Sequence, residues 1–148
     1  MDMPPSAAAP PPDDDAPVEK PIPLHDFLAF DFDRPGKGDR VAEVRMPIRA
    51  EALGFTQNVH GGAIATLVDL TTAIAAARAT DFDPYAESLV TSDMHIRYLG
   101  SARGEYVTGL GKVVRIGRQL IVVECNVVDS TERLVASADV ALMRVPLR

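Results

Sequence analysis

Two adjacent glycines and one carboxylate in an apolar segment are the first candidate functional residues of this chain. The segment begins with His60-Gly61-Gly62 and holds Asp69 among Ala, Leu, Ile, Val and Thr. Neither Gly nor Pro occurs from Ala63 to Asp83, so we predict a helix at about 60–79. Backbone N–H groups at a helix start attract partial negative charge, and a carboxylate within an apolar helix must be paired, solvated or used.

The composition of the chain argues against several kinds of partner. A formal net charge of −6 and a pI near 5.0, with no basic stripe, argue against a nucleic-acid partner. The three histidines are scattered and Cys125 is the one cysteine, so we expect neither a metal site nor a disulfide, and a reducing cytoplasmic location fits. No apolar run reaches the ~20 residues that a membrane span requires.

The start of the chain differs in composition from the rest. Residues 1–21 are rich in Pro, Ala and Asp and lack the basic and apolar regions of a signal peptide, so we predict a disordered tail. Residues 22–148 are then expected to form a single domain, which is long enough to bury a core without disulfides or metals. Within it, 24–33 is predicted as a short helix or turn and 34–38 as a turn.

Alternating apolar and polar residues predict strands on both sides of the helix. One covers 39–50, and four follow the helix at 88–99, 105–115, 119–128 and 133–145, the last three forming a meander with short turns. In 88–99, strict alternation places one set on one face (Val90, Ser92, Met94, Ile96, Tyr98) and the other set opposite (Leu89, Thr91, Asp93, His95, Arg97, Leu99). This order of elements predicts an α+β fold in which a curved antiparallel β-sheet wraps around a long central α-helix.

Three parts of the chain together resemble a known family. They are HGGAIATLVD at 60–69, SDMHIRYLGSARGE at 92–105, and a turn centred on Gly117 between alternating strands. These residues resemble the hotdog-fold thioesterases, and within them the PaaI-like acyl-CoA thioesterase group, over about residues 38–145. The resemblance implies the hotdog fold and hydrolysis of an acyl-CoA thioester to free acid and coenzyme A. No cofactor is implied, because coenzyme A is part of the substrate.

The resemblance also implies roles for particular residues. In this family the first glycine after the histidine donates its N–H to the thioester carbonyl, which makes Gly61 the oxyanion donor. The family's carboxylate falls on Asp69, as general base or nucleophile, and a Ser or Thr that helps to hold the water falls on Thr91. Substrate and coenzyme A contacts are implied at Asn58, His60, Gly62, Tyr98, Arg103, Arg115, Gly117 and Arg118. Relatives often carry Asn or Gln six residues before the histidine, where this chain has Gly54.

Helix geometry adds a prediction about assembly. Gly61 and Asp69 are eight residues apart, which corresponds to about 12 Å along a helix axis. A carboxylate at that distance cannot reach a carbonyl held by the Gly61 N–H of the same helix. The two groups must therefore come from different subunits, so we expect an obligate homodimer with two sites at its interface. The resemblance implies in addition a tetramer built as a dimer of dimers.

Other interpretations of these residues stay open at this stage. The glycine pair could permit close helix–sheet packing, Asp69 could be a structural carboxylate, and Thr91 could serve packing alone. His60 is interpreted as shaping the helix start, and any single arginine could be a solvated surface charge. The main alternative function is a non-catalytic acyl-CoA-binding hotdog protein, such as a sensor. A hotdog dehydratase or hydratase is disfavoured, because neither His60 nor His95 stands in the pattern of those enzymes.

Overall fold

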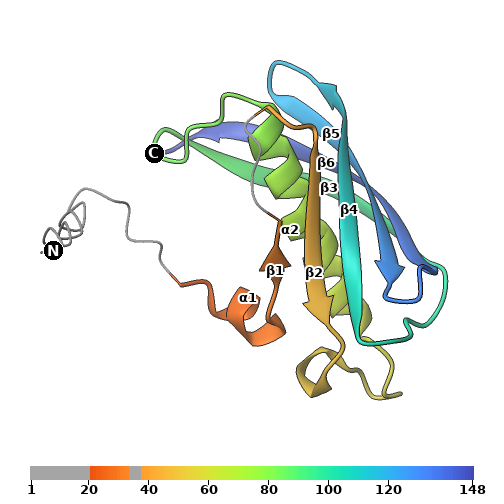
Figure 1. Cartoon of the computed structure of the whole chain (residues 1–148). Helices are drawn as coiled ribbons and strands as arrows, with labels where there is room; N and C mark the ends of the chain where they lie inside the picture. The colour runs from red at the N-terminus through yellow and green to blue at the C-terminus, as the bar shows by residue number, and fades with distance from the viewer. Residues whose placement is uncertain (1–20, 34–37) are drawn as a thin grey trace, which may run out of the picture.

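One antiparallel sheet with a long helix against its concave side makes up the body of the molecule (Figure 1). The computed structural model describes residues 21–33 and 38–148. Its elements in chain order are α1 (Pro23–Leu28), β1 (Asp31–Phe32), β2 (Val41–Pro47), the 3-10 helix η1 (Ala50–Ala52), α2 (Gly61–Ala79), β3 (Glu87–Tyr98), β4 (Tyr106–Ile116), β5 (Leu120–Asp129) and β6 (Leu134–Pro146). The predicted α+β arrangement, with a sheet curved around a central helix, is confirmed.

The strands are ordered β1-β2-β4-β5-β6-β3, and each neighbouring pair is antiparallel. The meander β4-β5-β6 follows the prediction, while β3 lies at the sheet edge beside β6. The two-residue strand β1 was not predicted, since so short a strand has no detectable alternation. The predicted tail and the turn at 34–38 fall mostly outside the described residues, which include only Pro21 of the former and Gly38 of the latter.

Alternation and close approach explain how the core is packed. Ala42, Val44 and Met46 of β2 are buried against the helix, as the sequence pattern predicts. Gly109 on β4 lies directly under the helix, where an added Cβ would overlap the hydroxyl of Thr71. A side chain at this position would hold helix and sheet apart, so Gly109 permits their close contact.

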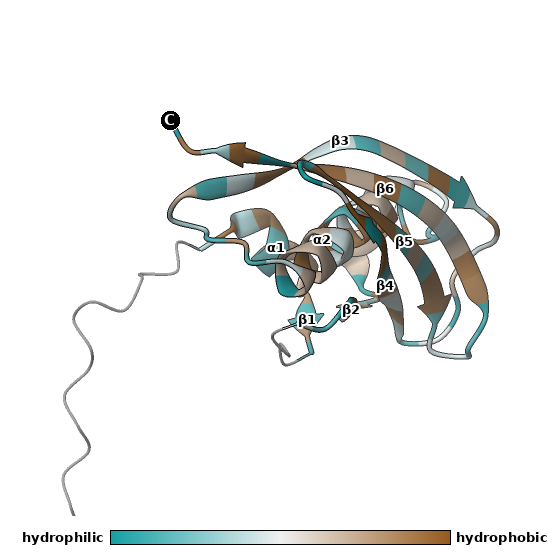
Figure 2. Ribbon diagram, turned by 90° about the horizontal axis from the view of Figure 1, so that it is seen from above, coloured by the Kyte–Doolittle hydropathy of each residue, from teal (hydrophilic) through white to brown (hydrophobic). Residues whose placement is uncertain are grey.

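Helix α2 is buried on one side only. Its sheet-facing residues, among them Leu67 and Val68, are fully buried. The opposite side, which includes Thr66, Asp69 and Ala73, is half-exposed, so the expectation of an almost completely covered helix is not met within one chain. The helix is long and apolar enough to cross a membrane by length and composition, yet half of it is buried in the fold, as in the core helix of a globular domain (Figure 2).

A β-bulge in β3 corrects the predicted faces of that strand. The register with β6 shifts between Thr91 and Asp93. As a result Thr91 lies opposite the buried Leu142, and Tyr98 lies opposite the buried Ala136. Residues opposite each other in a ladder share a face, so Thr91 and Tyr98 both point to the helix side. Strict alternation placed them on opposite faces and was wrong, because an extra residue in one strand inverts the pattern that follows it.

Candidate active site

The start of α2 leaves one backbone donor unused. His60 is the N-cap, and its Nδ1 accepts from the Gly62 N–H at 2.8 Å. The carbonyl of His60 accepts from the N–H groups of Ala63 and Ile64, at 2.9 and 3.1 Å. The N–H of Gly61 has no acceptor among the described residues. It is therefore available to a ligand, at the end of the helix where partial negative charge is favoured.

Asp69 lies about two turns further along the helix and is held by the sheet. The hydroxyl Oγ1 of Thr91 donates to Asp69 Oδ1 at 2.5 Å. No partner for the second oxygen, Oδ2, is present within residues 21–33 and 38–148. The carboxylate thus has one oxygen fixed and one available, on the half-exposed side of α2.

Tyr98 also lies at the helix start, with 54% of its surface exposed. Its hydroxyl donates to the carbonyl of Gly61 at 2.9 Å. The ring packs so closely that a Cβ on Gly61 would lie 3.5 to 3.7 Å from it. The structure therefore brings Asn58, His60, Gly61, Gly62 and Tyr98 to one end of α2, with Asn58 on the exposed loop before the helix. Gly54 lies beside His60 and supplies no amide side chain.

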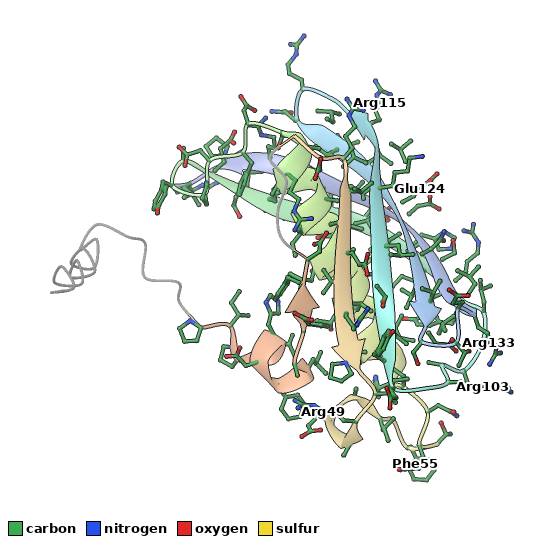
Figure 3. The ribbon with its side chains drawn as sticks, in the orientation of Figure 1. Arg49, Phe55, Arg103, Arg115, Glu124 and Arg133 are labelled. Atoms are coloured by element: carbon green, nitrogen blue, oxygen red, sulfur yellow. The ribbon has the colours of Figure 1, made fainter. Side chains whose placement is uncertain are left out.

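The predicted arginines do not gather in one place within a single chain. Arg103 precedes β4, while Arg115 lies near the other end of this strand and Gly117 and Arg118 lie in the turn to β5. Figure 3 shows Arg103 and Arg115 at opposite ends of the sheet. The turn borders a cavity of about 340 Å³. A Cβ on Gly117 would lie 2.8 Å from the carbonyl oxygen of Leu120, so the tight turn requires glycine.

One further arginine accompanies Arg103. The backbone N–H groups of Arg103 and Arg133 both donate to the carboxylate of Asp129, at 2.9 and 3.1 Å. Figure 3 shows the two side chains near each other at the same end of the sheet as the start of α2. Neither has a carboxylate partner in the part of the chain that the structure describes. The sequence offered no signal for Arg133 beyond its place after a turn.

A comparison with models of protein families identifies the family of this chain. The family model described as the thioesterase superfamily matches residues 56–136, which include the helix start, Asp69, Thr91 and the Gly117 turn. The chain belongs to the thioesterase superfamily. Its fold is the hotdog fold of that superfamily, as the sequence predicted.

Individual relatives of this thioesterase-superfamily chain agree with the assignment. It is 36% identical over 75 residues to Putative esterase VNG_1336C of Halobacterium salinarum, a match over 51% of this chain and 48% of that protein. The chain thus matches about half the length of this curated relative. The structure of BH2602 from Bacillus halodurans with CoA is 31% identical, with a TM-score of 0.64, over 70% of this chain and 66% of that one.

The fold of this superfamily member is also similar to that of the PaaI protein from the phenylacetic acid degradation operon of E. coli. The TM-score is 0.72 over 84% of this chain and 85% of PaaI. Their sequences are 22% identical, so the likeness concerns the fold.

Two other features of this superfamily member stand apart from Asp69. A cavity of about 570 Å³ lies between α1, Phe32 of β1, and Leu70 and Ile74 of α2. It adjoins β1 at one sheet edge, whereas Asp69 is bonded to β3 at the other.

Burial raises the pKa of the Cys125 thiol to about 12, so this thiol is not a ready nucleophile. Within the described ranges, no group of three or more His, Cys, Asp or Glu residues could hold a metal ion.

Proposed function

We propose that this chain is a PaaI-like acyl-CoA thioesterase of the cytoplasm, which hydrolyses an acyl-CoA thioester to the free acid and coenzyme A. Membership of the thioesterase superfamily supports the hydrolase class, and the CoA-containing structure of the BH2602 protein supports the ligand. The observation that carries the proposal is the pair formed by the unused Gly61 N–H and the Asp69 carboxylate anchored by Thr91.

The two groups act together when two chains combine. Within one helix they are about 12 Å apart, which is too far for one carbonyl group. The half-exposed side of α2, where Asp69 lies, is the side that a second α2 would cover. A two-fold axis between antiparallel helices would place the Asp69 of the partner subunit beside Gly61, twice per dimer. A tetramer would then be a dimer of two such dimers.

The same symmetry would bring arginines of two chains to one end of the dimer. In an antiparallel dimer, the end of β4 that carries Arg115 and Arg118 of the partner subunit would lie at the same end as the helix start and Arg103 of the first chain. Arginine side chains bind phosphate through paired N–H donors, so this grouping suits the phosphates of coenzyme A.

The chemistry follows from these positions. The thioester carbonyl oxygen accepts from the Gly61 N–H, and the charge that develops on it is stabilised there by a term worth ~3–4 kcal/mol for one good donor. Asp69 either takes a proton from water as the water oxygen bonds to the carbonyl carbon, or attacks that carbon directly. The C–S bond then breaks, the sulfur leaves with the electron pair, and a proton completes the thiol of coenzyme A. On the second path this leaves an acyl anhydride on Asp69, which water cleaves to the free acid and the free carboxylate.

A thiol-release assay on a panel of CoA thioesters tests the proposal. The wild-type protein is expected to release CoA, and Asp69→Asn, which keeps the shape but not the charge, is expected to lose at least ~10²-fold in kcat. Binding of acyl-CoA by the wild type without turnover would instead identify an acyl-CoA-binding protein. Full turnover by Asp69→Asn would exclude Asp69 as the catalyst.

A proline tests the oxyanion donor without breaking the helix. Gly61 is the first helical residue, where proline is tolerated, and the φ and ψ of His60, −62° and 134°, suit a residue before proline. Gly61→Pro replaces the amide hydrogen by a ring carbon and adds a ring beside Tyr98, so we expect kcat to fall ~10²–10³-fold with the fold retained. Gly61→Ala keeps the N–H and is expected to lose less. Equal losses in the two variants would contradict the role of the N–H group.

A further inference from the structure

The peptide unit between Gly61 and Gly62 is held at both of its polar groups by side chains. Its carbonyl accepts the hydroxyl hydrogen of Tyr98 at 2.9 Å, and its N–H donates to His60 Nδ1 at 2.8 Å. Both rings also lie beside the glycines, where an added Cβ would meet them. A Cβ on Gly62 would lie 3.0 Å from His60 Nδ1, and one on Gly61 would lie 3.5 Å from the Tyr98 ring.

These two hydrogen bonds restrict the conformational freedom that two successive glycines give to the helix start. Glycine has the widest conformational freedom of any residue, and the first turn of a helix lacks part of its internal hydrogen bonding. Two backbone bonds to the His60 carbonyl orient the preceding peptide, which carries the Gly61 N–H, but they hold only while Gly61 and Gly62 keep their helical conformation. An oxyanion donor stabilises the transition state only if it is already aimed at the place where charge develops.

We propose that Tyr98 and His60 are positioning residues that clamp the Gly61–Gly62 peptide and thereby aim the Gly61 N–H at the substrate carbonyl. The inference rests on the proposed thioesterase function. It gives Tyr98 and His60 a role other than the substrate or coenzyme A contact that the family resemblance implies. Neither side chain needs to touch the reacting atoms, since each acts through the peptide that it holds.

The β-bulge in β3 contributes to the position of Tyr98. It turns Tyr98 toward the helix together with Thr91, so one strand contacts one half of each of the two proposed sites. Bulges commonly redirect side chains next to active sites. Strand β3 thus holds Asp69 of its own chain through Thr91 and Gly61 of its own chain through Tyr98.

Tyr98→Phe removes only the hydroxyl and keeps the ring against Gly61. We expect kcat to fall about tenfold, the scale of a misplaced catalytic group, with KM and inhibition by free coenzyme A unchanged. Tyr85→Phe is the matched control, because Tyr85 is 68% exposed and lies outside the site. A raised KM at constant kcat would make Tyr98 a substrate contact and overturn the inference, as would wild-type values for both constants.

His60 offers a second test with a conservative pair. The Oδ1 atom of Asn stands where Nδ1 of His stands and can accept from the Gly62 N–H, whereas Leu has a similar shape and no acceptor. We expect His60→Leu to lose several-fold more kcat than His60→Asn. Equal losses would overturn the role of the His60 acceptor.

Amide hydrogen exchange followed by NMR separates a failure of this inference from a failure of the proposed function. In the ligand-free protein, Tyr98→Phe is expected to speed exchange at Gly62 several-fold and to leave the amides of β5 and β6 unchanged. If the wild type hydrolyses no thioester, the proposed function fails. The hydrogen-exchange measurement alone then tests whether Tyr98 holds the Gly61–Gly62 peptide. Unchanged exchange at Gly62 would show that the clamp does not exist.

Discussion

Thr91 donates a hydrogen bond of 2.5 Å to Asp69 and so ties the edge strand β3 to the middle of helix α2. The bond fixes one carboxylate oxygen and leaves the other toward the uncovered side of the helix. It depends on the β-bulge between Thr91 and Asp93, which directs Thr91 and Tyr98 to the same face. A single irregularity in one strand therefore orients the carboxylate of one proposed site and, through Tyr98, the glycine pair of the other proposed site of the dimer.

The contribution of Thr91 can be measured with two substitutions. Thr91→Val keeps the shape of the side chain but leaves Asp69 free to rotate, so we expect kcat to fall about tenfold with a smaller change in KM. Thr91→Ser retains the hydroxyl and is expected to lose less. Steady-state thiol release compares the variants, and a Thr91→Val enzyme as active as the wild type would show that Asp69 needs no such anchor.

The exposed arginines are expected to act on the nucleotide part of the substrate. Arg103→Gln and Arg118→Gln should each raise the KM for acyl-CoA about fivefold, or ~1 kcal/mol of charge-assisted hydrogen bonding. The KM for the matching acyl-pantetheine, which lacks the nucleotide, should not change. Arg97→Gln is the control, because Arg97 pairs with Asp139 at 3.7 Å. An equal effect on both substrates would argue against phosphate binding.

Because the sheet and the helix are in close contact at Gly109, a larger residue there is expected to lower the stability of the fold. An added Cβ would overlap the hydroxyl of Thr71, so Gly109→Ala is expected to lower the free energy of unfolding by ~1–3 kcal/mol. Gly100→Ala is the control, since its Cβ would meet only Arg133 Nη2, at 3.8 Å. Chemical denaturation of both variants gives the comparison, and equal stability of the two would contradict this packing.

The hydrogen-bonded carboxylate of Asp129 predicts that part of the folding stability is lost in acid. Burial raises its pKa, but hydrogen bonds from the Thr131 hydroxyl and from the N–H groups of Arg103, Arg133 and Thr131 outweigh this and lower it to about 2. The unfolded value is ~3.9, so the ionised form stabilises the fold above about pH 4, and this stabilisation is lost as the pH falls toward 2.

A comparison of melting temperatures checks the sign of this effect. The Tm difference between the wild type and Asp129→Asn should be largest above about pH 4 and should shrink between pH 4 and 2. A difference that grows as the pH falls would contradict it.

Much of the architecture could be predicted from the sequence because its signals are local. Helix 60–79 and the five long strands follow from residue composition and alternation within short windows, and they match α2 and β2 to β6 closely. The faces of β3 could not be predicted, since the bulge at Ser92 is defined only by its pairing with β6. Tyr98 was predicted as a site residue, but its bond to Gly61 joins residues 37 positions apart. Arg133 was missed because only the folded turn brings it beside Arg103.

Mixing two inactive variants tests the shared site most directly. Asp69→Asn protomers keep Gly61, and Gly61→Pro protomers keep Asp69. After unfolding, mixing and refolding together, a mixed dimer would contain one intact site and one site that lacks both groups. We expect thiol release by the equimolar mixture to recover to about a quarter of the wild-type rate per protomer, since random pairing gives half mixed dimers. No recovery above the two separate variants, with mixed dimers verified by mass, would contradict a site built from two subunits.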